Sequence, residues 1–307
     1  MTPGTGWVPT DLFLDRVKKA YFAALSESPQ LSSRSVWGSI AAIQNEIHSA
    51  LTSDSNGRLR EILSDPGSSD LFYGLDNLCV SFLTQPGDFR PLSAEADALL
   101  KKTLQAFDAI DFGLRFPTPF RGEWGAPTEY GVVTYRAVLA LYQTLLILRL
   151  AGKGAKVVEI GPGLGRTALH CGQAGIQSYT TIDLPMGIVA QACFLGATLG
   201  EDKIWFSTED TSPVGKIRIV SFPWVRGRNE HFDIALNVDS ITEMSPLTAI
   251  EYGRWIKRTS NIFVSINRSY RRSGMGRIRA LCFPLAKHSK KDFPLRSRYS
   301  EEVFQFR

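Results

Sequence analysis

A short apolar strand that runs straight into three closely spaced glycines constrains this chain more than any other feature. Residues 156–160 read K-V-V-E-I, residues 161–165 read G-P-G-L-G, and a helical pattern begins at residue 166. Glycine has no Cβ, so the backbone of such a turn can approach a ligand closely. The helix that follows presents its N-terminus, which favours polar or anionic groups. The segment therefore predicts a strand, turn and helix built around a ligand.

The same alternation continues along the chain and predicts the fold class. After a long apolar helix over 130–150, the sequence alternates between short apolar runs and amphipathic segments, which is typical of a parallel sheet with helices on both faces. We expect an α/β, doubly wound sheet with strands at 156–160, 178–182, 204–207, 217–221, 232–237 and 261–266 and helices at 166–174, 186–199 and 245–257.

The first part of the chain has a different character. Residues 1–120 predict helices separated by turns, including apolar positions at helical spacing over 12–24 and 36–51 and a helix over 93–110 with Ser93 as its N-cap. We expect a helical cap or substrate-side region over 1–120, followed by the α/β domain over 121–307.

An acidic residue at the end of the second predicted strand suggests what the glycine turn binds. Asp183 lies 22 residues beyond Gly161, and a carboxylate there can accept hydrogen bonds from both hydroxyls of a ribose. A dinucleotide fingerprint, G-x-G-x-x-G, would place its third glycine at position 166, which is Arg166. The spacing favours a nucleoside cofactor other than a dinucleotide.

The pattern E-x-G-x-G-x-G followed by a strand-end Asp resembles the first two motifs of class I S-adenosylmethionine-dependent methyltransferases. This resemblance implies a Rossmann-like methyltransferase sheet and S-adenosylmethionine as the cofactor, with the glycine turn under the methionine moiety and the acid on the ribose. It assigns cofactor binding to Glu159, Gly161, Gly163, Gly165 and Asp183.

A narrower resemblance covers residues 120–270. Leu184 and Pro185 follow the ribose acid directly, residues 233–244 read D-I-A-L-N-V-D-S-I-T-E-M, and a later strand ends at Asn267. This block is similar to the sugar O-methyltransferase family, which implies transfer of a methyl group to a hydroxyl of a sugar or glycoconjugate.

Polar side chains follow two strands at the edge where the ligand is expected. Ligands of open α/β sheets lie outside the carboxyl ends of the strands, which favours Asn237, Ser240 and Asn267 as substrate contacts. An acceptor hydroxyl is a weak nucleophile and needs a positioned base. Asp239 is our first candidate for that base and Glu243 the second, since a helix begun by residue 239 would place both on one face.

Two alternatives remain open at this catalytic site. Asp239 or Ser240 could instead cap the following helix, in which case His288 is the next candidate base. Asp239, Glu243 and Asn267 could also bind a divalent cation that acidifies the acceptor hydroxyl, although we favour a site without metal.

Charge and cysteine usage bear on partners and compartment. Residues 268–307 hold eleven Lys or Arg against three acidic residues, a local net charge of +8, which suggests a phosphorylated acceptor. The four cysteines form no C-x-x-C pair, and the most apolar stretch, 137–148, is too short to span a bilayer. We therefore expect a cytoplasmic protein with reduced thiols and no membrane span.

Other functions compete with O-methylation. They are methylation of another small molecule or of RNA, nicotinamide-dependent oxidoreduction, and cofactor binding without catalysis. The glycine spacing disfavours the oxidoreductase, and no base-flipping motif or aromatic residues interleaved with the C-terminal arginines support nucleic-acid binding. The sequence does not define the oligomeric state.

Overall fold

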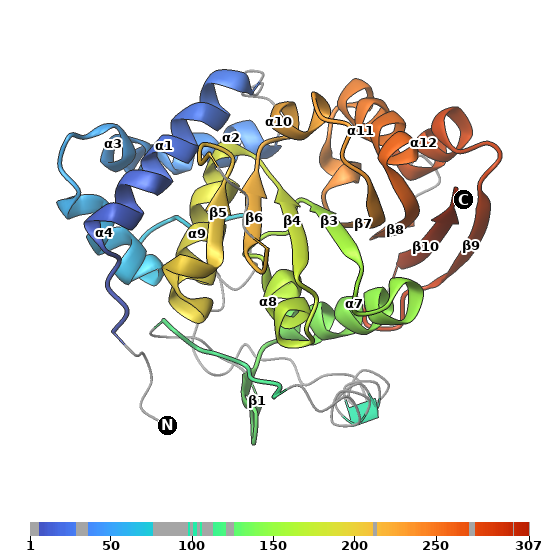
Figure 1. The fold of residues 1–307 in the computed structure, drawn as a ribbon, viewed down its shortest axis with the longest axis horizontal. Coiled ribbons are helices and arrows are strands. Elements are labelled where there is room, and N and C mark those ends of the chain that lie inside the picture. The colour runs from blue at the N-terminus through green and yellow to red at the C-terminus, as the bar shows by residue number, and fades with distance from the viewer. Residues whose placement is uncertain are drawn as a thin grey trace.

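The computed structural model describes residues 6–28, 36–75, 98, 101–102, 105, 113–120, 126–210, 214–269, 274–296 and 298–306. Within these ranges one large sheet crosses the molecule (Figure 1). Its strands are β3 (Lys156–Ile160), β4 (Ser178–Ile182), β5 (Ile204–Phe206), β6 (Ile217–Val220), β7 (Phe232–Val238), β8 (Ser260–Arg268), β9 (Lys287–Asp292) and β10 (Tyr299–Gln305).

The strand order is β5-β6-β4-β3-β7-β8-β10-β9, and the first six strands in this order pair in parallel. In the described sheet β10 lies between β8 and β9 and is antiparallel to both, so it runs opposite to the other seven strands. The predicted doubly wound, Rossmann-like α/β fold is confirmed. Because the chain winds outward in both directions from β3 and β7, the carboxyl ends of these two strands form a switch point where a ligand can bind.

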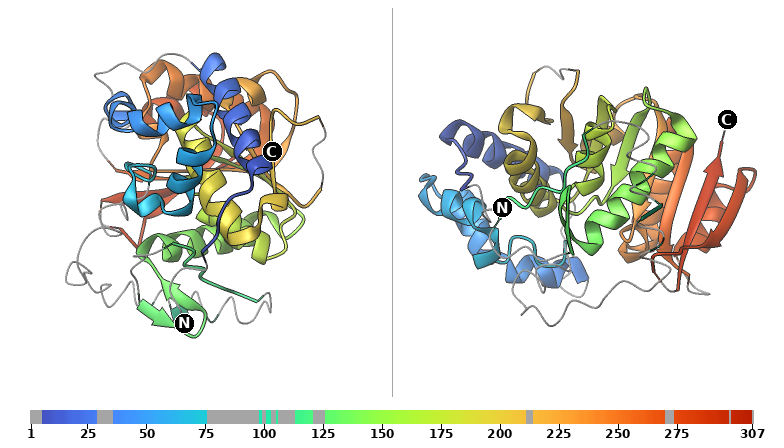
Figure 2. Two further views of the ribbon diagram at one scale, coloured as in Figure 1. Left: turned by 90° about the vertical axis from the view of Figure 1, so that its left-hand side faces the viewer. Right: turned by 90° about the horizontal axis from the view of Figure 1, so that it is seen from below.

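Two layers of helices enclose the sheet (Figure 2). One face packs against α7 (Tyr135–Ala151), α8 (Arg166–Gln173) and α9 (Pro185–Leu199), and the other against α10 (Phe222–Arg226), α11 (Pro246–Thr259) and α12 (Gly274–Cys282). Helix α9 is apolar on nearly all sides, which predicts a fully covered helix.

The N-terminal helices provide that cover. They are α1 (Asp11–Glu27), α2 (Val36–Ile43), α3 (Asn45–Thr52) and α4 (Gly57–Ser64), followed by a single 3₁₀ turn, η1 (Pro66–Ser68). Helix α1 packs on α9, with Phe13, Leu14 and Val17 fully buried in the core that also contains the sheet. The Arg16 guanidinium ties α1 to β5 and the turn after it, since it donates to the carbonyl of Ile204 at 2.7 Å and pairs with Glu209 at 2.6 Å.

Some predicted elements differ from the structure. The helical run expected over 36–51 is broken at Gln44, whose buried amide donates to the carbonyl of Asp70 at 3.1 Å. The helix expected from residue 130 begins at Tyr135, because residues 126–133 form the small antiparallel hairpin of β1 (Ala126–Thr128) and β2 (Gly131–Val133). The helix expected over 93–110 lies almost wholly outside the described residues.

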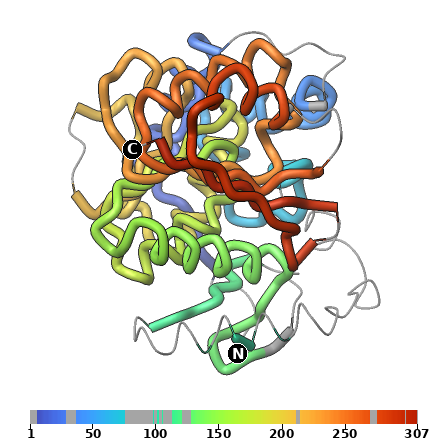
Figure 3. The backbone as a smooth tube through the Cα atoms, turned by 90° about the vertical axis from the view of Figure 1, so that its right-hand side faces the viewer, coloured from blue at the N-terminus to red at the C-terminus, as the bar shows by residue number. Residues whose placement is uncertain are grey.

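The sequence did not predict the hairpin of β9 and β10, which lies between α7 and α12 in Figure 3. Its two glutamates, Glu301 and Glu302, are 3% and 6% exposed. Lysines on β9 pair with them: Lys291 lies 3.1 Å from Glu301, and Lys290 lies 3.3 Å from Glu302. Buried ion pairs therefore replace the apolar alternation that normally identifies a strand.

Candidate functional site

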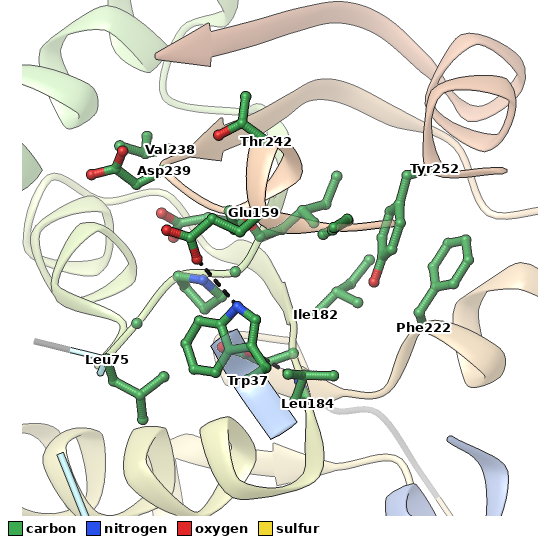
Figure 4. A pocket seen from close by; sticks show the side chains of 18 of the residues that line it. Trp37, Leu75, Glu159, Ile182, Leu184, Phe222, Val238, Asp239, Thr242 and Tyr252 are labelled. Atoms are coloured by element: carbon green, nitrogen blue, oxygen red, sulfur yellow. Dashed lines mark hydrogen bonds between the residues drawn. The ribbon is translucent and has the colours of Figure 1, made fainter. Parts of the chain in front are cut away.

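A cavity of about 1470 Å³ opens at the carboxyl edge of the parallel strands. Its walls come from the segments that follow β3, β4, β6, β7 and β8, and from the N-terminal region (Figure 4). Trp37 of α2 and Leu75 both face this space, opposite the loop that carries Asp239. Ligand pockets commonly measure 300–1,000 Å³, so this cavity has room for two small molecules side by side.

The glycine turn forms one wall and is tightly enclosed by protein. Gly161 and Gly163 have φ angles of +66° and +62°, which favour glycine. A Cβ at Gly161 would lie 2.4 Å from the Ser240 hydroxyl, and one at Gly163 would lie 3.0 Å from the carbonyl oxygen of Leu75. Gly165 does not line the cavity; it precedes α8 with φ +82° and packs against Leu195.

Glu159, at the end of β3, is a buried acid at the floor of this cavity. Its residue is 2% exposed, and its carboxylate accepts a hydrogen bond from the Tyr179 hydroxyl at 2.7 Å. Burial raises the pKa of Glu159 to about 7, against the opposing effect of its hydrogen bonds. Because its hydrogen bonds do not fully stabilise the ionised form, the Glu159 carboxylate is suited to bind a cationic group of a ligand.

Asp183 lies after β4 on the adjoining wall. It accepts hydrogen bonds from the Leu184 N–H and from the Gln191 amide, both at 2.8 Å. Burial raises its pKa to about 7, so two donors do not fully replace water. Gly187 makes the position possible, because a Cβ there would lie 2.4 Å from the Asp183 carboxyl carbon. Each carboxylate oxygen can accept a further hydrogen bond, as a pair of ribose hydroxyls would supply.

An apolar wall continues from Asp183. The Phe222 ring stacks on Tyr252 with centroids 3.7 Å apart, and both residues line the cavity with Leu184. The Ser221 hydroxyl beside them donates to Glu27 at 2.9 Å, which ties α1 to this side of the site. These side chains give the cavity an apolar, aromatic surface beside Asp183.

Asp239 occupies the opposite end of the cavity, in a strained turn after β7. Its φ of 59° is in the left-handed region, which asparagine and aspartate tolerate best after glycine. Its carboxylate accepts a hydrogen bond from the Arg296 guanidinium, and Arg136 lies 3.9 Å from the same oxygen. Two arginines from distant parts of the chain therefore converge on this one acid.

Glu243 and Asp239 do not share a helix face, contrary to the sequence-based expectation. Residues Ile241–Glu243 form a 3₁₀ turn, η4, and α11 begins only at Pro246 with Ser245 as its N-cap. Glu243 is exposed to the cavity and accepts a hydrogen bond from the Trp37 indole at 3.2 Å. Its carboxyl group is nevertheless partly shielded from solvent by the surrounding protein. This desolvation, reinforced by the charge of Asp239, raises the pKa of Glu243 above its usual value.

Of the three residues expected to contact substrate, one lines the cavity and two do not. Ser240 lines the cavity, but Asn237 and Asn267 are 0% and 2% exposed and do not. Asn267 donates to Asn237 at 2.9 Å, and Asn237 donates to the carbonyl of Ile160 at 3.0 Å. Both amides therefore lie outside the lining of the cavity, where they brace the loop between β7 and η4.

Several cavity residues were not identified from the sequence. They include three arginines that line the cavity near Asp239, which we call its acceptor end: Arg136 on α7, Arg268 at the end of β8 and Arg296 before β10. Arg277 and Arg279 are exposed on α12 away from the cavity, and positions 271 and 272 lie outside the described residues. The positive charge at the site therefore comes from only part of the basic segment, together with a helix far upstream.

His288 does not enter the cavity. Its ring stacks on Phe304 with centroids 4.5 Å apart and bonds to Glu302, on the outer strands of the sheet. This placement removes it as a candidate base. The described part of the chain contains no group of three or more His, Cys, Asp or Glu residues arranged to hold a metal ion. None of the helices described is long and apolar enough to cross a bilayer.

Comparison with known proteins finds distant structural similarities. No family model matches the sequence, and no curated protein matches it. The PH0226 protein of Pyrococcus horikoshii OT3 is 12% identical, with 58% of this chain and 94% of that chain covered and a TM-score of 0.44. The magnesium protoporphyrin IX methyltransferase ChlM of Synechocystis PCC 6803, solved with S-adenosylmethionine bound, is 12% identical (56% and 80% covered, TM-score 0.39).

A third solved structure, the methyltransferase domain of bacterial CtHen1, is 10% identical, with 56% of this chain and 98% of that chain covered and a TM-score of 0.43. At these identities the similarity concerns the fold alone.

Proposed function

We propose that this chain is an S-adenosylmethionine-dependent methyltransferase that transfers the methyl group to a hydroxyl of a sugar or glycoconjugate. The observation that supports it most is the composition of one cavity. Its walls include Glu159, Gly161, Gly163 and Asp183 at the end proposed for the cofactor, and Asp239, Ser240 and Glu243 in the loop that begins beside the glycine turn and leads to the other end. The sugar assignment rests on the sequence block that contains these last three residues.

The chemistry of the first end fits the cofactor. S-adenosylmethionine would supply an electrophilic methyl group on a positively charged sulfur. Asp183 would accept hydrogen bonds from the ribose hydroxyls, and the Phe222 side of the cavity would cover the adenine. Glu159 would place negative charge near the cationic part of the ligand. Gly165 would act indirectly, by allowing the turn that leads into α8.

At the other end we propose Glu243 as the base, ahead of Asp239. Asp239 is already bonded to Arg296, whereas Glu243 faces the cavity and, among the described residues, accepts a hydrogen bond from the Trp37 indole. The raised pKa of Glu243 also brings it closer to the pH at which it would accept a proton. Asp239 would instead hold the arginines, and Ser240 would contact the acceptor.

The test begins with calorimetry of the full chain against S-adenosylmethionine, its demethylated product and NADH. Binding of NADH alone would contradict the proposal. Transfer of labelled methyl to a panel of sugars and sugar phosphates then identifies the acceptor. Glu243→Gln should lower kcat by about 10²–10⁴-fold with cofactor affinity unchanged. Glu61→Gln, at an exposed position on α4, is the matched control. Full turnover in Glu243→Gln would exclude Glu243 as the base.

A further inference from the structure

Three arginines and a tyrosine from three separate parts of the chain line the acceptor end of the cavity. They are Arg136 on α7, Arg268 at the end of β8, Arg296 in the loop between β9 and β10, and Tyr299 at the start of β10. We propose that they bind a phosphoryl group of the acceptor, so that the substrate is a phosphorylated sugar. This inference rests on the proposed function and defines its substrate class.

The contacts among these side chains show a preassembled cluster. Arg296 lies over the Tyr299 ring, 4.0 Å from its centroid, and Arg268 donates to the Tyr299 hydroxyl at 3.2 Å. Stacking holds a guanidinium in one plane and leaves its N–H groups available to an anion. The pKa of Tyr299 is raised to about 12, mainly by burial and secondly by the hydrogen bond to Asp239. Its hydroxyl therefore stays protonated and can donate a hydrogen bond.

The charge of the cluster favours an anion. Among the residues that the structure describes, three guanidinium groups and two carboxylates, Asp239 and Glu243, line this end of the cavity, and their charges sum to a positive value. The side chains of Arg136 and Arg296 are 22% and 25% exposed, so a ligand in the cavity can reach both. Planar guanidinium forks bind phosphate oxygens in pairs, which a neutral sugar cannot exploit.

Asp239 is the internal counter-ion of this cluster. Its carboxylate occupies the Arg296 guanidinium and lies near Arg136, which is where a phosphoryl group would bind. The two anions therefore compete for the same donors. This competition predicts that removing the charge of Asp239 strengthens anion binding, which a purely structural role for the arginines does not predict.

The experiment measures inorganic phosphate binding to the full chain by calorimetry, with and without the demethylated cofactor. We expect Arg296→Gln and Arg136→Gln each to weaken phosphate binding at least tenfold, and Arg296→Lys to weaken it less. Asp239→Asn should strengthen it several-fold. The control, Arg277→Gln, replaces an exposed arginine outside the cavity and should change nothing.

Ligands of matched shape identify the anion. Glucose 6-phosphate should bind more tightly than glucose or glucuronate; tighter binding of glucuronate would overturn the phosphoryl assignment. Equal phosphate affinity in wild type and Arg296→Gln, or no phosphate binding by a protein that binds the demethylated cofactor, would overturn the cluster as an anion site. Failure of the cofactor itself to bind would refute the proposed function and is read in a separate titration.

Discussion

Glu159 should destabilise the unliganded protein at neutral and alkaline pH, and replacing it with glutamine should recover that stability. Burial raises its pKa from 4.5 to about 7. As pH rises, the unfolded state therefore loses this proton first, and the free energy of unfolding falls between about pH 4.5 and 7. Above pH 7 both states are ionised, and the penalty is constant at about 3 kcal/mol at most.

The assay is urea unfolding of wild type and Glu159→Gln at pH 4, 5.5, 7 and 8. The glutamine variant should match wild type at pH 4 and exceed it by up to about 3 kcal/mol at pH 8. Its side-chain oxygen can still accept the Tyr179 hydrogen bond. Glu61→Gln, at an exposed carboxylate, should show no such pH dependence. A difference that is the same at every pH, or a glutamine variant less stable at pH 8, would refute the reasoning.

The same carboxylate should favour the ligand. If the positive sulfur of S-adenosylmethionine lies near Glu159, the affinity of wild type should rise with pH through about 7, because the ionised acid then attracts the cation. Glu159→Gln should flatten that profile in calorimetry, and an unchanged profile would place the cation elsewhere.

Three further perturbations test other parts of the structure. Gly187→Ala should displace the Asp183 carboxylate and weaken binding of the demethylated cofactor roughly tenfold, about 1.4 kcal/mol by calorimetry; normal affinity would exclude the ribose role. Asp239→Ala should be about 1 kcal/mol less stable than Asp239→Asn in urea unfolding, because alanine tolerates the left-handed conformation less well. Phe13→Ala should cost about 3–5 kcal/mol and keep a single unfolding transition, since this ring is fully buried in the core shared with the sheet; two transitions would mean that α1 unfolds independently.

The central sheet could be predicted from the sequence because its strands are apolar and short and its helices follow at regular intervals. The glycine turn and Asp183 were identifiable for the same reason: each is local, directly after a strand. Strand β9 reads K-H-S-K-K-D and had no such signal, because its charges are satisfied by glutamates on β10.

The acceptor end of the site was only partly predictable. Asp239 and Glu243 were found because they follow a strand, but the turn at Asp239 has a positive φ that no pattern indicated. Asn237 and Asn267 appeared to be substrate contacts because strand-end amides can serve a ligand or a neighbouring loop equally well. Trp37 comes from a helix whose position depends on long-range packing, which a single sequence does not encode in any local pattern.

The position of β10 inside the sheet gives this protein an order of assembly. Although β9 precedes it in the chain, β9 pairs with β10 alone among the strands described, so it cannot join the sheet until β10 has been synthesised and inserted. Until then the backbone of β8 remains an open edge, which is prone to intermolecular pairing. Chains truncated before residue 299 should therefore aggregate more readily than full-length chains, because they leave the β8 edge unpaired.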